Sequence, residues 1–338
     1  QILDHFLHFF SIELQLRHRG GILFEDVLED VSRRGTVPIL QAIVDLNEAE
    51  AEAAIWRLLE KGVEAIAVCF LWSFLEPKHE ARVKQMIGDI APNMFVTTSH
   101  ELVPKWGEYE RTAAVALNAY IGPLTTGYLV GVARDVIKLG YHQPLQITQC
   151  AGGTISVDRA MAAPLLTLDS GPVAGVTGSQ YAGSLMGYKN IITTDMGGTS
   201  FDVGIIHDGK PAFSYTSLVH QYAYYLSKVD IQTIGAGGGS KAWIDETSGM
   251  LRVGPESAGA DPGPACYGLG GETATVTDAD LILGYLDGNN FAGGTMHLDS
   301  AAAETALQKI ADPLGLNLQE TAAGIAKIAE FQMADLIR

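Results

Sequence analysis

A glycine-rich turn between two apolar stretches constrains this chain more than any other feature. Residues 191–194 lead into the turn and residues 201–206 lead out of it, and both stretches have the composition of short buried strands. The turn reads Asp195-Met196-Gly197-Gly198-Thr199-Ser200. Glycines let backbone N–H groups approach an anion, hydroxyls add hydrogen bonds, and a carboxylate can hold a hydrated magnesium ion. The segment predicts a β-hairpin that either binds nucleotide phosphates or only uses its glycines to turn.

Helical and strand patterns alternate before this hairpin. The amphipathic pattern at 46–61 precedes an apolar strand pattern, and the helical pattern at 77–90 precedes a strand pattern at 95–98. A long helical pattern at 108–140 is expected to be interrupted near Gly122-Pro123. This order indicates an α/β fold.

Three further glycine clusters lie at 151–154, 170–175 and 235–240, and most of them follow an apolar run. In open α/β sheets, ligands bind at loops beyond the strand ends. Several glycine loops therefore favour a nucleotide site over an ordinary hairpin. The Pro/Gly-rich segment at 253–268 is predicted to be an ordered surface loop.

Composition narrows the class of protein. The chain has 338 residues, of which 47% are hydrophobic and 18% charged, so it can bury a core. A net charge of -17 gives no general attraction to nucleic acid or anionic lipid. The three cysteines and nine histidines show no metal-ligand spacing, which predicts no zinc site and a reducing cytoplasm. We expect no signal peptide and no stretch that is apolar enough to span a bilayer.

The order of the motifs resembles the hydantoinase A / oxoprolinase family, which includes ATP-dependent hydantoin and 5-oxoproline hydrolases and subunits of ketone carboxylases. The resemblance covers residues 25 to 338. The matching motifs are Glu108-Tyr109-Glu110-Arg111-Thr112, Asn118-Ala119-Tyr120, Gly152-Gly153, Ser170-Gly171-Pro172, Asp195-Met196-Gly197-Gly198-Thr199-Ser200, Gly237-Gly238-Gly239-Ser240, Gly254-Pro255-Glu256-Ser257-Ala258-Gly259, Pro262-Gly263-Pro264-Ala265-Cys266-Tyr267-Gly268 and Thr275-Val276-Thr277-Asp278-Ala279.

The resemblance implies an incomplete actin-like ATPase (ribonuclease-H-like) α/β fold, with mixed sheets flanked by helices. Residues 1–100 would be a remnant of the family's N-terminal domain and residues 101–338 a shortened central domain. In this family two glycine hairpins grip the phosphates. The Asp195 hairpin matches the second. The family's first hairpin, another Asp-x-Gly-Gly-Thr expected near the N-terminus, is not found in this sequence. The implied cofactors are ATP with Mg²⁺ or Mn²⁺, and the implied partner is a hydantoinase B-type subunit in a cytoplasmic oligomer.

The candidate site residues follow from this match. Asp195 is expected to be catalytic and to hold the metal–nucleotide. Asp202 is expected to be catalytic as a base or a second metal contact, or else a paired strand residue. Glu108 is expected either to be catalytic or to belong to a solvated helix face beside Glu110 and Arg111. Asp278 is predicted to be a helix N-cap, and Cys266 to be structural. The expected nucleotide-binding residues are Gly197, Gly198, Thr199, Ser200, Gly237, Gly238, Gly239 and Ser240.

Three functions remain open on these residues. The first is ATP-dependent hydrolysis of a cyclic amide of the hydantoin or 5-oxoproline type, in which phosphorylation of the amide oxygen creates a leaving group. The second is the ATP-using subunit of an acetone- or acetophenone-type ketone carboxylase. The third is a non-catalytic domain that folds without binding a nucleotide.

Overall fold

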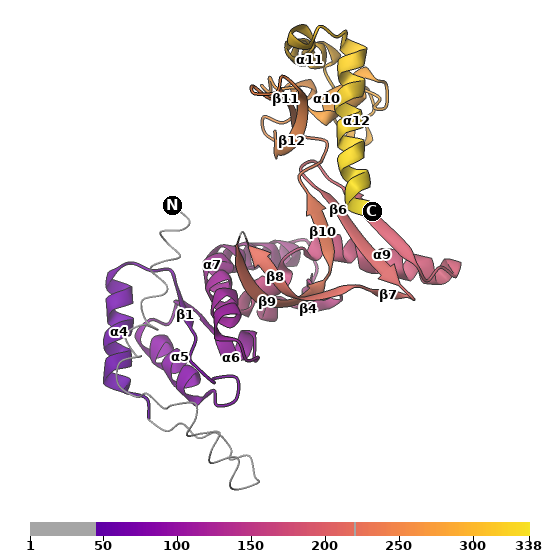
Figure 1. The fold of residues 1–338 in the computed structure, drawn as a ribbon. Helices are drawn as coiled ribbons and strands as arrows, with labels where there is room; N and C mark the ends of the chain where they lie inside the picture. Colours follow the sequence, from indigo (N-terminus) through magenta and orange to yellow (C-terminus); the bar gives the residue numbers. More distant parts are fainter. Residues whose placement is uncertain (1–44, 220) are drawn as a thin grey trace. The chain divides into compact units, whose positions relative to one another are not determined.

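The computed structural model describes residues 45–219 and 221–338 (Figure 1). The chain divides into two compact units. Of the described residues, unit 1 contains those from 45 up to Ser170 together with those between Phe213 and Lys228, and unit 2 contains Gly171–Ala212 together with Val229–Arg338. The predicted domain boundary near residue 100 concerns the domains of the family and stays a prediction.

Unit 1 begins with two helix–strand repeats. Helix α4 (Glu48–Glu60) starts at Asn47, whose side chain accepts the N–H of Glu50, and leads to strand β1 (Ala65–Val68). Helix α5 (Lys78–Ile90) leads to strand β2 (Phe95–Thr98), which pairs with β1 in parallel. These elements pack around a shared apolar cluster that includes Ile55, Ile66, Val83 and Ile87.

The rest of unit 1 packs against one long helix, α7 (Glu108–Lys138), which follows the single turn α6 (Ser99–Leu102). The expected interruption near Gly122-Pro123 is wrong, because α7 continues through Pro123. Gly122 is required there by close packing, since a Cβ would lie 2.4–2.6 Å from the Phe95 ring. The other elements of unit 1 are β3 (Gln146–Thr148), β4 (Thr154–Ser156), α8 (Val157–Ala162), η2 (Pro164–Thr167), β8 (Phe213–Val219) and β9 (Tyr222–Val229).

Helix α7 is also the single candidate for a membrane span among the residues that the structure describes, judged by length and composition. The expectation that no stretch passes this test is therefore wrong. Its residues Ala113, Ala114 and Leu117 belong to the core cluster of unit 1. A core helix of a soluble protein passes the same test, so this helix is weak support for a membrane span.

Unit 2 is built first from helix α9 (Ser170–Met186) and a small antiparallel sheet. The strands are β5 (Ile191–Met196), β6 (Phe201–His207), β7 (Lys210–Pro211) and β10 (Ile231–Ile234), and β6 lies between β10 and β5. The helix packs on the sheet through Val173 and Val176, which share a buried cluster with Ile206 and Ile231. Both strands of the predicted hairpin are thus present.

The remainder of unit 2 forms a second core. Hairpin β11 (Ser240–Ile244) and β12 (Leu251–Ser257) packs with α10 (Val276–Ile282), α11 (Ser300–Leu314) and α12 (Leu318–Ile337); the short helices η3 (Ala265–Tyr267) and η4 (Ala292–Gly294) lie between them in sequence. The predicted surface loop at 253–268 is wrong at both ends. Its start is strand β12. Near its end Ala265 and Cys266 are buried in apolar clusters, and their N–H groups donate to the Asp278 carboxylate.

Candidate nucleotide site

The predicted hairpin brings two carboxylates together. Strands β5 and β6 pair antiparallel with Asp195 directly opposite Asp202. Residues 197–200, here called the glycine turn, connect the strands, and the Gly197 N–H donates to the Ser200 carbonyl at 3.0 Å. Directly opposed residues of an antiparallel pair share one face of the sheet, where like charges destabilise each other.

The two carboxylates differ in their partners. Asp202 accepts a hydrogen bond from the Thr233 hydroxyl at 2.5 Å and from the Ser200 hydroxyl at 3.3 Å. Asp195 is exposed, and its carboxylate makes no hydrogen bond or ion pair with any residue in the described parts of the chain. Carboxylate oxygens are the ligands that Mg²⁺ prefers in proteins, so the opposed pair fits a divalent cation that offsets the repulsion.

A pocket of about 130 Å³ lies beside this pair within unit 2. Strands β5, β6 and β10 contribute Asp195, Asp202 and the residues around them, and α9 contributes its first turns. The lining residues are Pro172, Gly175, Val176, Ser179, Thr193, Thr194, Asp195, Asp202, Gly204 and Ile231.

The second predicted glycine motif lies directly on the glycine turn. Residues 235–240, here called the supporting loop, donate two backbone hydrogen bonds to it: Gly238 N–H to the Gly197 carbonyl at 3.1 Å and Gly239 N–H to the Gly198 carbonyl at 2.6 Å. The Gly237 N–H donates to the Ser240 hydroxyl at 2.8 Å, inside the loop. The structure therefore brings together the two glycine motifs, about 40 residues apart in sequence. The N–H groups of Gly237, Gly238 and Gly239 all have protein acceptors.

Thr277 and Ser240 hold the supporting loop in turn. The N–H and the hydroxyl of Thr277, in the first turn of α10, both donate to the Gly238 carbonyl at 2.8 Å. Ser240 is fully buried, and its hydroxyl accepts from the Gly237 N–H and donates to the Gly235 carbonyl, both within the loop. No sequence signal distinguished Thr277 from an ordinary helix-start threonine.

The prediction that Asp278 is the N-cap of a helix is wrong, because the N-cap lies three residues earlier. Thr275 is the N-cap of α10, and Asp278 is the third helical residue of a capping box, in which each side chain bonds the other residue's backbone. The buried Asp278 carboxylate also binds the Cys266 N–H at 2.7 Å. Burial, reinforced by the neighbouring Asp278 carboxylate, raises the pKa of the Cys266 thiol well above its usual range, which agrees with a structural cysteine.

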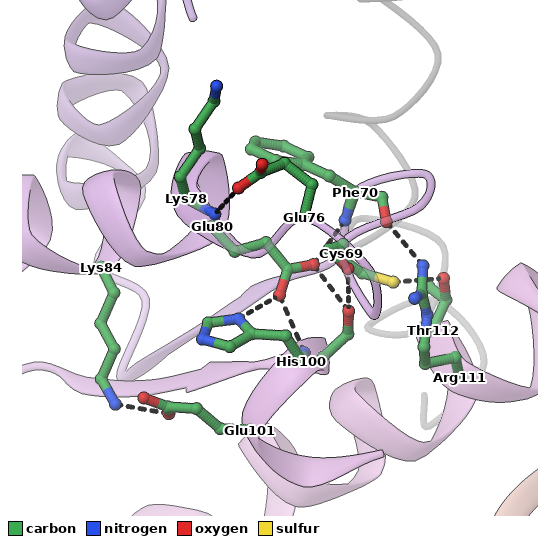
Figure 2. Close-up of polar contacts among 12 residues, drawn as sticks. Cys69, Phe70, Glu76, Lys78, Glu80, Lys84, His100, Glu101, Arg111 and Thr112 are labelled. Atoms are coloured by element: carbon green, nitrogen blue, oxygen red, sulfur yellow. Dashed lines mark hydrogen bonds and ion pairs between the residues drawn. The ribbon is translucent and has the colours of Figure 1, made fainter. Parts of the chain in front are cut away.

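Glu108 lies in unit 1, at the first residue of α7, beside a cluster that sequence reasoning missed. Its neighbour Arg111 is not on a solvated helix face, because it is fully buried and donates to the Phe70 carbonyl at 2.6 Å (Figure 2). The Arg111 Nε has no hydrogen-bond partner in the described part of the chain. Arg111 also lies over the Phe74 ring, 5.4 Å from its centre.

Buried Glu80 is the centre of this cluster (Figure 2). One oxygen accepts the Phe70 N–H at 2.7 Å and the Ser99 hydroxyl at 2.6 Å, and the other accepts the His100 N–H at 2.9 Å and contacts the His100 Nδ1 at 2.8 Å. Glu80 thus ties together the segments that follow β1 and β2. The sequence held one signal that Glu80 is buried, namely its helical spacing. Glu80 precedes Val83 and Ile87 by three and seven residues, which places it on the buried face of α5.

The described residues thus form an α/β protein whose second unit carries opposed carboxylates beside a doubly supported glycine turn. The chain belongs to the hydantoinase/oxoprolinase family: the family pattern matches residues 111–338, and the pattern of the family's N-terminal region matches residues 13–91. The predicted family is confirmed.

Two relatives and one solved structure show how far the likeness extends. The chain is 40% identical over 298 residues to caprolactamase subunit alpha of Pseudomonas jessenii, covering 87% of this chain and 42% of that protein. It is 38% identical over 301 residues to the acetophenone carboxylase gamma subunit of Aromatoleum aromaticum, covering 87% and 41%. A nucleotide-free structure of acetone carboxylase matches with a TM-score of 0.78 at 31% identity, covering 89% of this chain and 43% of that one.

These matches confirm the α/β fold class. The chain spans less than half the length of these relatives. The named relatives are subunits of larger enzymes, and the solved acetone carboxylase is described as ATP-dependent.

Proposed function

We propose that this chain supplies the ATP-binding part of an enzyme that hydrolyses a cyclic amide. The observation that carries the proposal is the opposed pair Asp195 and Asp202 at the end of a glycine turn, because two carboxylates and open backbone N–H groups suit a metal-bound triphosphate. In the proposal Asp195 holds the metal, and Asp202, already fixed by Thr233, is a second metal contact or a base. Mg²⁺ or Mn²⁺ would supply charge neutralisation for the phosphates when bound.

The glycine turn would hold the phosphates. The N–H groups of Gly198 and Thr199 donate to no acceptor in the described residues, and the hydroxyls of Thr199 and Ser200 lie at the same turn. Gly237, Gly238, Gly239 and Ser240 would contribute through the turn, since their donors are already used. Glu108 remains a proposed residue of the site, but we propose no specific contact between it and the nucleotide.

The chemistry explains why ATP would be needed. The carbonyl of an unstrained amide is a poor electrophile. Attack of the amide oxygen on the γ-phosphorus, with ADP leaving, would give a phosphorylated imidate. Water would then add to its carbon, the ring C–N bond would break with the protonated nitrogen leaving as an amine, and a second water would hydrolyse the resulting acyl phosphate to a carboxylate and phosphate. The caprolactamase relative, whose name specifies a cyclic amide, supports this class of substrate. A hydantoinase B-type partner subunit and a cytoplasmic location belong to the same proposal.

A second candidate is the ATP-using subunit of a ketone carboxylase. It is favoured by the TM-score of 0.78 with acetone carboxylase, against 0.68 with the caprolactamase structure. Both candidates use the same hairpin, so the choice between them depends on the substrate and not on the nucleotide.

The test uses the full-length protein with its partner subunit. We expect Mg-ATP hydrolysis stimulated by hydantoin, 5-oxoproline or caprolactam; stimulation only by a ketone with bicarbonate would select the carboxylase. Asp195→Ala should abolish nucleotide binding, whereas Asp335→Asn, which removes an exposed carboxylate paired with Arg338, should not. Nucleotide binding that survives Asp195→Ala would refute the site, and absence of any nucleotide binding by the wild type would select the non-catalytic alternative.

A further inference from the structure

We propose that the supporting loop is the element that aims the phosphate-binding N–H groups of the glycine turn, with Gly237 and Thr277 as positioning residues. This inference rests on the proposed nucleotide site and deepens it. It assigns to residues 235–240 a role distinct from ligand contact.

The first argument is the geometry of the peptide group. In a trans peptide, the carbonyl of one residue and the N–H of the next point in opposite directions. The Gly197 and Gly198 carbonyls both point at the supporting loop, since they accept from Gly238 and Gly239. The N–H groups of Gly198 and Thr199 must therefore point away from those donors. Two successive N–H groups directed the same way form a nest that suits an anion.

The second argument is the closeness of the two backbones. A Cβ on Gly237 would lie 2.7 Å from Gly197 O, from Gly198 C and from Thr199 N. A Cβ on Gly239 would lie 2.8 Å from Gly198 O. Backbone atoms cannot yield as the end of a flexible side chain can, so any side chain at residue 237 would have to displace the glycine turn.

The third argument is that the supporting loop is itself anchored. Thr277 donates twice to the Gly238 carbonyl, and α10, which carries Thr277, is fixed at its start by the capping box of Thr275 and Asp278. A continuous path of hydrogen bonds thus runs from the first turn of α10 to the Gly197 carbonyl. The Thr199 hydroxyl is also 3.3 Å from that of Ser257.

The test measures binding of Mg-ATP to the full-length protein by displacement of a fluorescent ATP analogue. Thr277→Val keeps the volume and the backbone N–H but removes the hydroxyl donor, and should weaken binding about three- to tenfold. Thr277→Ser should restore it. Gly237→Ala should weaken binding by more than about tenfold, whereas Gly178→Ala, at an exposed α9 glycine with open space around it, should leave binding unchanged.

Hydrogen exchange of the nucleotide-free protein gives a second readout. We expect slow exchange at Gly238 and Gly239 without nucleotide, and slow exchange at Gly198 and Thr199 only after Mg-ATP is added. Fast exchange at the loop glycines that slows with Mg-ATP would mean that they contact the ligand, and would overturn the inference.

The two failures can be told apart. If the wild type binds no nucleotide, or if Asp195→Ala binds it normally, the proposed function fails. If Asp195→Ala abolishes binding while Thr277→Val binds as tightly as the wild type, the nucleotide site stands and the supporting role is refuted. The Thr277 pair decides the matter even if Gly237→Ala does not fold.

Discussion

Replacement of Glu80 by glutamine tests the buried cluster of unit 1, because it only replaces one carboxylate oxygen by an NH₂ group. Each carboxylate oxygen accepts one main-chain N–H, that of Phe70 on one side and that of His100 on the other. A glutamine amide presents one oxygen and one NH₂ group. The Ser99 hydroxyl and the His100 ring could adapt to a donor, but a main-chain N–H cannot. Whichever way the amide lies, one backbone donor must face another donor.

The magnitude follows from this conflict. The substitution removes one charge-assisted hydrogen bond, worth about 1.5–3 kcal/mol, and leaves a buried N–H without an acceptor, which costs about 1–3 kcal/mol. We expect a loss of about 3–4 kcal/mol in the free energy of unfolding, within the range for breaking a buried charged network. Glu101→Gln is the matched control, since its main partner is Lys84 in a solvent-exposed pair, and it should cost less than about 1 kcal/mol.

Urea unfolding of the full-length protein, followed by tryptophan fluorescence, measures the effect. Three of the four tryptophans of this chain, Trp56, Trp72 and Trp106, lie in unit 1, so the contribution of this chain to the signal is weighted towards that unit. With a slope of about 2 kcal/mol per molar urea, the midpoint should fall by about 1.5–2 M. A midpoint for Glu80→Gln no lower than that of Glu101→Gln would refute the proposed hydrogen-bond conflict.

Three further predictions concern other buried positions. Burial, with the Glu330 charge, raises the pKa of Asp280 to about 6. The protein should therefore lose stability as the pH rises from about 4 through 6 and the Asp280 carboxyl ionises. Asp280→Asn should stabilise the protein by about 1 kcal/mol at pH 7 after discounting for solvent screening. Gly122→Ala should lower the melting temperature by clashing with a phenyl ring, whereas Gly127→Ala, in open space on α7, should not. Burial raises the pKa of Cys150 to about 11, so alkylation mass spectrometry at pH 8 should find it unmodified until the protein unfolds.

The elements that could be predicted are those whose local pattern agrees with their packing. Helix α5 and strand β2 lie where the helical pattern at 77–90 and the strand pattern at 95–98 predicted them. Helix α7 shows the limit of local rules, because Pro123 removes one backbone donor while the surrounding buried contacts keep the helix continuous. Glu80 shows another limit: an acidic residue in a helix predicts exposure, and only its partners from two other segments explain its burial.

The two glycine motifs show why the site could be predicted only in part. Both motifs have the composition of an anion-binding loop, so sequence reasoning gave both the same role. What separates them is the direction of their N–H groups, which depends on the acceptors that each one meets. Gly238 and Gly239 meet the carbonyls of the glycine turn, whereas Gly198 and Thr199 meet none in the described residues. Peptide geometry places an N–H group on the far side of each accepting carbonyl. Gly238 and Gly239, whose own N–H groups are used, therefore direct the N–H groups of Gly198 and Thr199 away from the supporting loop, where an anion can reach them.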